Sequence, residues 1–482
     1  MNKKFFAALA SATMAFTASG SIAVFADDFV EEKNPVINNG QVTPKPTKVL
    51  WNQENFGDLA TKKGDVNPAV TGLDTVKPDE KGYVETKTLE AVTNIQLSTN
   101  FKGEIKGLEY FTGLTSFYDT YATAVTNTKL DFSANKVLNT LSVSKAADLT
   151  EIVLPEPVVT EKDGKEEVTY SLNSLTLSGT ALTTLDLSAQ DALTYITVTG
   201  NSNLKEVKLQ QGTSRTHSAY GTVDLSKNNL DTVDFTNVDF YDLNLGDNHI
   251  GALDLSNTTV TGTATLYPQT FYVSETLKNV NLAETFENFD KTAVSTNHEY
   301  DEKTGVLTID GGDAYYHYNT GVKNDNQYLT VTLKAANPMN RLYNPNSGEH
   351  FYTADIKEKN ALVDLGWNDE GFGWVAAPTK GATEKQAVYR LYNPNAGDHH
   401  YTMSTDERDT LVTFGWKAEG TGWYSADEAG KEATGTHVSV YRQYNPYANG
   451  AGSHNYTTSK AENNYLCNLG WVYEGTAWTA LQ

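Results

Sequence analysis

The amino-acid sequence predicts a multi-domain, mainly β protein that contains a solenoid, a small β cap and a three-fold repeat domain with short helices. Three observations support this prediction. Short leucine-containing units recur between residues 130 and 255, alternating strand patterns continue to residue 336, and residues 337–482 hold three copies of a longer motif. Repetition at a fixed period is typical of structures that stack copies of one unit. The 482 residues are enough for roughly three domains.

The composition favours a folded protein that does not bind polyanions. Hydrophobic residues make up 39% of the chain and aromatic residues 11%, which is enough to build cores. The net charge is −23, from 60 acidic and 37 basic residues. Binding to nucleic acid or to an anionic lipid surface requires clustered Lys and Arg, so we expect neither as a partner.

Residues 1–26 have the pattern of a secretory signal peptide. Lys3 and Lys4 give a positive start, an apolar run extends from Phe5 to about Thr17, and Val24-Phe25-Ala26 supplies a cleavage site. No later stretch approaches the ~18 apolar residues of a transmembrane helix. We therefore expect an extracellular protein, secreted or non-covalently associated with the cell surface. Residues 27–48, acidic and then Pro-rich, predict a flexible leader.

Residues 116–258 repeat a short unit whose strand-like triplet starts with Leu, Ile or Val. Triplets begin at residues 130, 141, 152, 175, 185, 196, 207, 223, 233, 243 and 253, and polar inserts at 161–167 and 212–218 explain the longest gaps. Two units make a coil of 20–22 residues, which is the leucine-rich-repeat range. We expect a solenoid with apolar side chains inward and Asp, Ser, Thr or Lys outward. Asn135, Asn228 and Asn248 are expected at turns.

These repeats resemble the irregular, internalin-like leucine-rich repeats of secreted Gram-positive surface proteins. The resemblance covers residues 107–258 and begins at GLEYFTGLTSF. It implies an N-terminal cap at 49–115 and a solenoid that recognises a ligand, such as a host or bacterial surface protein. In some relatives the cap carries a calcium loop. Its ligand positions here would be Lys77, Asp79, Lys81 and Thr88, a poor set for calcium, so we expect no metal.

Four aromatic side chains of the solenoid are candidates for an exposed binding face, with a scaffold role as the alternative. They are Tyr195, Tyr220, Phe240 and Tyr241. Beyond them, residues 259–336 predict a cap, which the solenoid requires because its last coil would otherwise expose an apolar face. The segment EYDEKTGVLTI resembles an Ig-like β-sandwich that often follows such solenoids. His317 is expected to be an ordinary strand residue.

Each copy in residues 337–482 contains RxYNP, GxHxYT, a helix-like stretch, Gly-Trp and EGxxW. This order predicts strand, turn, strand, short helix and strand, with a glycine that ends the helix. Three copies suit a closed three-fold domain, either β-trefoil-like, which we prefer, or a small propeller-like ring. Cys467 occupies the position of Val363 and Val412 in the other copies, which predicts a small buried apolar side chain and not a nucleophile.

The three copies resemble a largely uncharacterised repeat family of wall-associated bacterial proteins, which implies binding to glycan or cell-wall polymer. Aromatic rings stack on sugars, polar side chains bind hydroxyls, and three equal sites would add avidity. Trp367, Trp416 and Trp471 are expected in the core. The second tryptophans stay open between core and site, and the Arg and His residues between a buried network and a site. The candidate ligand residues are Arg341, Tyr343, His350, Tyr352, Trp374, Arg390, Tyr392, His399, Tyr401, Trp423, Arg442, Tyr444, His454, Tyr456 and Trp478.

The sequence thus predicts a secreted or cell-surface binding or adhesion protein. The solenoid would be the recognition surface, and the tail, residues 337–482, would bind glycan or cell wall. We find no GxSxG, HExxH or P-loop motif, and we expect no enzyme activity, no cofactor and no metal. Two alternatives stay open. One is a secreted glycan-active hydrolase, and the other is a tail that acts only as a structural or oligomerising module.

Overall fold

The computed structural model describes residues 35–38, 41–44, 46–119, 124–162, 164–210, 219–235, 237–309, 312–430, 437–448 and 450–481. The predicted signal peptide and much of the predicted leader lie outside them. The chain divides into two units, Met1–Val49 and Leu50–Gln482. In the first unit, β1 (Pro35–Asn38) and β2 (Gln41–Pro44) form an antiparallel hairpin, and β3 (Lys48–Leu50) follows. No helix in the described part of the chain is long and apolar enough to span a membrane.

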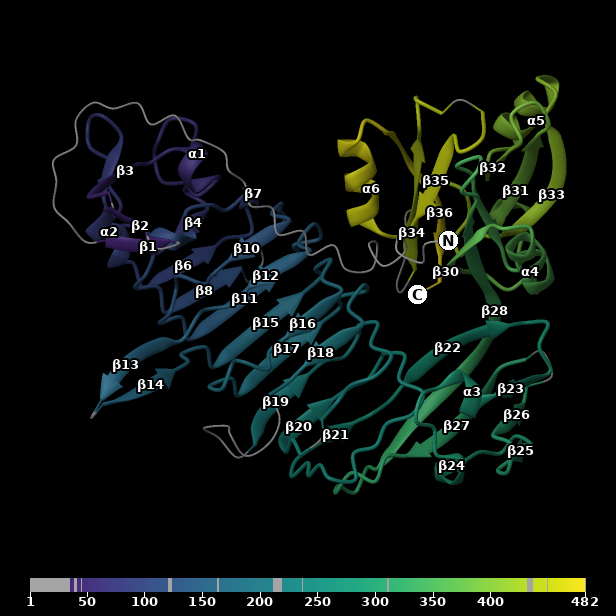
Figure 1. Cartoon of the computed structure of the whole chain (residues 1–482), viewed down its shortest axis with the longest axis horizontal. Coiled ribbons are helices and arrows are strands. Elements are labelled where there is room, and N and C mark those ends of the chain that lie inside the picture. The colour runs from purple at the N-terminus through teal and green to yellow at the C-terminus, as the bar shows by residue number, and fades with distance from the viewer. Residues whose placement is uncertain are drawn as a thin grey trace. The chain divides into compact units, whose positions relative to one another are not determined.

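The second unit begins with a solenoid built around a nine-stranded sheet (Figure 1). Only the first pair of strands in this sheet is antiparallel, and the rest are parallel. In sheet order the strands are β4 (Val70–Thr71), β6 (Asn94–Leu97), β8 (Ser116–Asp119), β11 (Thr140–Ser144), β15 (Ser174–Ser178), β17 (Tyr195–Thr199), β19 (Tyr220–Asp224), β20 (Phe240–Asn244) and β21 (Ala264–Thr265).

Shorter parallel pairs form the other side of the coils. The pairs are β7 (Lys102–Gly103) with β9 (Ala124–Val125), β10 (Lys129–Asp131) with β12 (Glu151–Val153), and β16 (Thr184–Asp186) with β18 (Glu206–Lys208). The triplets at 141, 175, 196, 223 and 243 lie in the large sheet, and those at 130, 152, 185 and 207 lie in the pairs. This alternation confirms that two units make one coil. The sheet also continues to β21, beyond the predicted solenoid boundary at residue 258.

The solenoid core combines inward apolar side chains with buried amides. Leu141, Leu175 and Ile196 are fully buried, as predicted. The side chain of Asn228 is also buried, and its Nδ2 donates to the carbonyls of Val198 (2.6 Å) and Leu225 (2.8 Å), while its Oδ1 accepts from Asn201 N (2.9 Å). Asn135 and Asn248 likewise bond backbone carbonyls of neighbouring turns. The amides therefore replace backbone partners that the tight turns leave unpaired.

The N-terminal cap contains α1 (Gln53–Phe56), β5 (Tyr83–Glu85), α2 (Thr86–Glu90) and the 3₁₀ turn η1 (Leu108–Tyr110). Its core includes Trp51, whose ring stacks on Phe56 with centroids 4.3 Å apart. In the segment compared with a calcium loop, Asp79 Oδ1 accepts from the backbone N–H groups of Lys81 (3.0 Å) and Tyr83 (2.9 Å). That carboxylate therefore closes its own turn.

The first polar insert of the solenoid is an exposed hairpin. It consists of β13 (Val158–Lys162) and β14 (Lys165–Thr169), which pair in antiparallel orientation. Every residue of β14 is exposed. The second insert, at 212–218, lies outside the described residues.

A β module follows the solenoid and has two sheets. One sheet contains β22 (Gln269–Ser274), β28 (Tyr328–Tyr343), β27 (Ala314–Asn319) and β24 (Val294–Ser295), and the other contains β23 (Asn279–Asn281), β26 (Val306–Thr308) and β25 (Tyr300–Asp301). The helix α3 (Leu282–Thr285) and the 3₁₀ turn η2 (Lys291–Ala293) connect them. The Nδ2 groups of Asn324 and Asn326 donate to the carbonyls of Val260 (2.8 Å) and Ala264 (2.7 Å), so the module covers the end of the last coil.

The tail contains three sets of three paired strands, each with one helix, and the first set shares the long strand β28 with the β module (Figure 1). Their strand orders are β29-β28-β30, β32-β31-β33 and β35-β34-β36, and a 3₁₀ turn η3 (Glu384–Gln386) precedes the second sheet. The remaining elements are β29 (His350–Thr353), α4 (Ile356–Asp364), β30 (Asn368–Ala376), β31 (Ala387–Asn393), β32 (Asp398–Thr402), α5 (Thr405–Thr413), β33 (Lys417–Tyr424), β34 (Val438–Tyr444), β35 (His454–Thr457), α6 (Lys460–Asn468) and β36 (Val472–Ala480).

Two layers of aromatic rings join the three tail sheets. Tyr352, Tyr401 and Tyr456 are fully buried, with ring centroids 5.6–5.7 Å apart. The second tryptophans form the next layer, with centroids 5.4–5.8 Å apart and tilted or edge-on rings, an arrangement that aromatic pairs favour. Three sets of strands around a shared core are what the propeller-like alternative predicts. The preferred trefoil arrangement is not what the described residues form.

Two further expectations for the tail need correction. The sequence places Leu362 and Leu365 on one side of the first helix-like stretch, but Leu365 is 76% exposed because α4 ends at Asp364 and Leu365 follows it. The position of Cys467 is not buried either. The side chain of Cys467 is half-buried, and its counterparts Val363 and Val412 are 38% and 43% exposed.

Candidate functional site

The structure removes six of the candidate ligand residues from the tail surface. Tyr352, Tyr401 and Tyr456 fill the core, and Trp374, Trp423 and Trp478 are only 2–4% exposed. An enclosed ring offers no face to a sugar, so we take these six out of the candidate site. The Gly-Trp tryptophans, expected in the core, are only half-buried, and Trp416 packs against the small apolar cluster of Ala387, Tyr389 and Leu391. The second tryptophans, which the sequence left open between core and site, lie in the core.

The buried tyrosine hydroxyls connect the three tail repeats in a closed cycle. Tyr352 Oη donates to Tyr456 O (3.0 Å) and accepts from Tyr456 N (3.0 Å). Tyr456 Oη has the same two contacts with Tyr401 (2.9 and 3.2 Å), and Tyr401 Oη accepts from Tyr352 N (3.2 Å). Each hydroxyl thus satisfies backbone groups of another repeat, which explains why a tyrosine recurs at this position.

The three candidate arginines also connect the repeats. Each guanidinium binds one glutamate of its own repeat at 2.7–2.9 Å and one glutamate on the helix of another repeat at 2.8–3.1 Å. The pairs between repeats are Arg341 with Glu462, Arg390 with Glu358, and Arg442 with Glu407. Because both lobes of each guanidinium are occupied, these arginines have a structural role that accounts for their repetition.

We call these six Arg–Glu pairs the charge ring, and Glu407 is one of its carboxylates. Burial raises the pKa of its carboxyl, but hydrogen bonds from His400 and Thr402 and the charge of Arg442 outweigh that effect. The net result is a pKa well below the ordinary glutamate value. Glu407 is therefore ionised throughout the neutral range.

The candidate histidines lie beside these charges. The ring of His350 lies 5.0 Å from the ring of Tyr343, and the rings of His399 and His454 lie 4.9 and 5.4 Å from Tyr392 and Tyr444. His399 also packs edge-on against Phe351 of the first repeat, 4.8 Å away. Within the described residues, no group of three His, Cys, Asp or Glu side chains is arranged to hold a metal ion. Of the fifteen candidates, only Tyr343, Tyr392 and Tyr444 keep a partly exposed ring outside the core and the charge ring.

The solenoid aromatics divide into two pairs. Tyr220 and Phe240 are buried, at 1% and 0% exposure, and their rings stack with centroids 5.8 Å apart. They are scaffold, because both rings are buried and belong to paired positions of adjacent strands. Tyr195 and Tyr241 are 52% and 59% exposed and stay candidates for a binding face.

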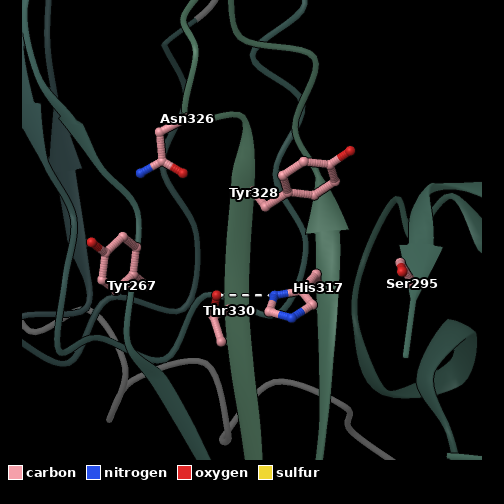
Figure 2. A pocket seen from close by; sticks show the side chains of 6 residues that line it. All are labelled: Tyr267, Ser295, His317, Asn326, Tyr328 and Thr330. Carbon is pink, nitrogen blue, oxygen red and sulfur yellow. Dashed lines mark hydrogen bonds between the residues drawn. The ribbon is translucent and has the colours of Figure 1, made fainter. Parts of the chain in front are cut away.

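A pocket of about 440 Å³ lies in the β module (Figure 2). Ser295, His317 and Thr330 form one row across β24, β27 and β28, because the strand register places them opposite one another. His317 Nδ1 and Thr330 Oγ1 are 3.1 Å apart. His317 is a strand residue, as expected, but its ring also lines this pocket.

Two tyrosines and an amide complete the pocket. Tyr267, just before β22, and Tyr328, at the start of β28, are 49% and 44% exposed. Asn326 lies in the loop that leads into β28. The six lining residues supply two phenol rings with their hydroxyls, two aliphatic hydroxyls, an amide and an imidazole, but no carboxylate, Lys or Arg. Such a lining favours a neutral ligand that has both an apolar face and many hydroxyls.

Sequence reasoning did not find this pocket. Tyr267 and Tyr328 are separated by 61 positions, and neither belongs to a repeat. The one local signal was the aromatic run AYYHYN around His317, since an alternating strand exposes every second ring. This run predicts which side chains of one strand lie on the same side of the sheet, but it does not predict which residues of other strands line the pocket with them.

Comparisons with known proteins add little beyond the repeat pattern. Residues 338–481 match a family model described as "Domain of unknown function (DUF5648)". No curated protein matches this chain. A solved structure titled "Functional domain of InlJ from Listeria monocytogenes includes a cysteine ladder" is similar over 53% of this chain and 93% of its own length, at 13% identity. Its TM-score is 0.14, which is too low to support an argument about fold or function.

Proposed function

We propose that this chain is a secreted or cell-surface, non-enzymatic protein that binds neutral glycan at the pocket lined by Tyr267 and Tyr328. The observation that carries the proposal is the combination of exposed tyrosine rings with uncharged hydrogen-bonding groups in one concave site. A sugar ring has apolar C–H faces and hydroxyls at its edge, so it needs both kinds of group at once. A volume of about 440 Å³ is within the range of ligand pockets.

The proposal favours binding over hydrolysis at this pocket. Glycoside hydrolysis generally requires two carboxyl groups on either side of the scissile bond. The six residues that line the pocket supply none. The alternative, a glycan-active hydrolase, would need its acidic pair elsewhere in the chain.

A weaker set of sites in the tail belongs to the same proposal. Tyr343, Tyr392 and Tyr444 each present part of a ring beside a histidine. Three such contacts, individually weak, could attach the protein to a cell-wall polymer through avidity. This retains the proposed wall-binding role of the tail, but with three residues in place of fifteen. If these tyrosines are not used, the tail is a structural module.

The test is calorimetric titration of the full mature chain with soluble neutral hexasaccharides of glucose and of N-acetylglucosamine. Tyr328→Ala should weaken binding at least tenfold, since it removes one of the two exposed rings. Tyr83→Ala is a matched control, because Tyr83 is also in a strand and is 41% exposed. Equal affinity in wild type and Tyr328→Ala would refute the pocket assignment. Release of reducing sugar during the titration would favour the hydrolase alternative.

A further inference from the structure

One side of the nine-stranded sheet carries a regular array of hydroxyl groups. Strand pairing aligns Ser142, Thr176 and Thr197 in one row and Ser144, Ser178 and Thr199 in the next. Ser174 lies beside Tyr195 in a third row. Neighbouring strands are about 4.8 Å apart, so the hydroxyls repeat at that spacing across the sheet. We call the outward side chains of β8, β11, β15 and β17 the hydroxyl face.

Most of these hydroxyls have no hydrogen-bond partner among the residues that the structure describes. Across the part of the chain that the structure describes, five half-exposed hydroxyls make no side-chain hydrogen bond to another protein group. They are Ser174, Thr176, Ser178, Thr197 and Thr199. In contrast, Ser116 Oγ donates to Asn94 Oδ1 at 2.8 Å, and Ser144 Oγ donates to the carbonyl of Asp119. A free hydroxyl both donates and accepts, so the array can bond a ligand of either polarity.

The hydroxyl face is also neutral. Its outward positions on the four strands are Ser, Thr and Tyr, whereas the whole chain has a net charge of −23. Carboxylates enter only on the following strands, at Asp224 and Asp242. A polyanion would meet repulsion from the chain as a whole, and a cationic partner would find no carboxylate on this face.

An exposed aromatic ring stands at the edge of the array. Tyr195 is 52% exposed, and its Cε1 would lie 3.0 Å from a Cβ placed on Gly221 of the adjacent strand. Gly221 therefore makes room for the tyrosine ring against the sheet. A ring that is fixed in this way can stack on a sugar with little loss of conformational freedom.

We propose that the hydroxyl face binds an extended neutral polysaccharide. A polysaccharide chain presents rows of hydroxyls and apolar ring faces, which match the free Ser and Thr hydroxyls and the ring of Tyr195. Protein interfaces depend on clustered Trp, Tyr and Arg anchors and seldom on Ser or Thr, whereas this face is mostly Ser and Thr with two tyrosines, Tyr118 and Tyr195, on different strands. The array spans several strands, so many weak contacts along one polymer would add up. This surface belongs to the solenoid and is independent of the pocket in the β module.

The test is co-sedimentation of the full mature chain with insoluble cellulose, insoluble β-1,3-glucan and chitin, and with an anionic polyuronate gel. Wild type should bind at least one neutral polymer and not the anionic gel. The variant Thr176→Val/Thr197→Val/Thr199→Val keeps side-chain shape but removes three hydroxyls, and it should weaken polymer binding at least tenfold. Tyr195→Ala should do the same. The control is Thr169→Val/Thr184→Val, which changes exposed threonines outside the hydroxyl face.

Each outcome bears on the proposal. Unchanged melting temperatures together with the predicted losses would support it. Equal polymer binding by wild type and both face variants, or no binding of any neutral polymer by wild type, would overturn it. Tyr328→Ala should lose soluble hexasaccharide but keep polymer binding, which separates failure of this proposal from failure of the pocket assignment.

Discussion

The solenoid and the tail are both repetitive, but they use their repeated residues in opposite ways. In the solenoid, backbone ladders and buried amides such as Asn228 hold successive coils together, and outward side chains such as Thr176 bond no other described group. In the tail, side chains hold the repeats together. Tyr hydroxyls, tryptophan rings and Arg–Glu pairs each close a three-membered cycle.

This difference shows that a repeated residue is not by itself a sign of a binding site. In a three-fold ring, one residue type at one position must satisfy the same contact three times. The most conspicuous repeated residues of the tail therefore belong to its assembly. Residues that are free to bind ligand are better sought where the scaffold leaves polar groups without partners.

The largest effect we predict is on the tail core. Trp423→Ala removes a ring that is 4% exposed and packs against two other tryptophans. It should lower the free energy of unfolding by about 3–5 kcal/mol. Tyr447→Ala, at a position that is 74% exposed, should change it by less than about 0.5 kcal/mol. Denaturant titration followed by tryptophan fluorescence measures both free energies of unfolding. A decrease below about 1 kcal/mol in Trp423→Ala would contradict the assignment of Trp423 to a shared core of the three repeats.

A smaller effect should follow from breaking the amide ladder of the solenoid. Asn228→Ala removes the side-chain partner of the Val198 carbonyl and of the Asn201 N–H in a buried turn, while the Leu225 carbonyl still accepts from Asn248 Nδ2. Since each unsatisfied group carries a desolvation penalty, we expect a loss of about 1–3 kcal/mol. Hydrogen exchange should show faster exchange in coils near residue 228 and unchanged exchange in the tail. Uniform acceleration across both regions would argue against separate modes of assembly.

The charge ring should make the tail sensitive to acid. The folded-state pKa of Glu407 lies below its unfolded value of about 4.3, so its stabilising contribution is complete above that value and is lost as pH falls through the folded pKa. At pH 7, Glu407→Gln should cost about 1–3 kcal/mol. In thermal melts, the difference in melting temperature between wild type and Glu407→Gln should become smaller as the pH falls from 5 to 3. If that difference in melting temperature stays constant over this pH range, Glu407 does not contribute to the acid sensitivity of the tail.

The smallest effect on stability should come from the hydroxyl face. Thr176→Val changes a half-exposed side chain that bonds no other described group, and the β-branched shape suits a strand. We expect a change within about 0.5 kcal/mol. Thermal melts of this variant and of Thr184→Val should coincide with wild type. A large loss in Thr176→Val alone would mean that the face is part of the scaffold.

Much of the fold could be predicted from the sequence, because its periods directly reflect local geometry. The spacing of 10–11 residues between units identified the two sides of each coil, and the order of motifs in the tail identified each sheet and helix. The packing of one copy on another could not be predicted. Whether Trp367 or Trp374 faces the shared axis depends on the orientation of the whole sheet, and both are tryptophans at fixed spacing. For the same reason, the sequence could not predict that Tyr267 and Tyr328 line one pocket, because only the folded β module brings them together.

The most direct test of this account measures stability and glycan affinity together in Arg390→Met. Arg390 joins Glu358 of the first repeat to Glu419 of its own, and the substitution keeps much of the side-chain volume. We predict a lower melting temperature and an unchanged Kd for the neutral hexasaccharide that binds wild type. A Kd raised tenfold or more at an unchanged melting temperature would contradict the account, because Arg390 would then be a ligand residue and not a part of the ring.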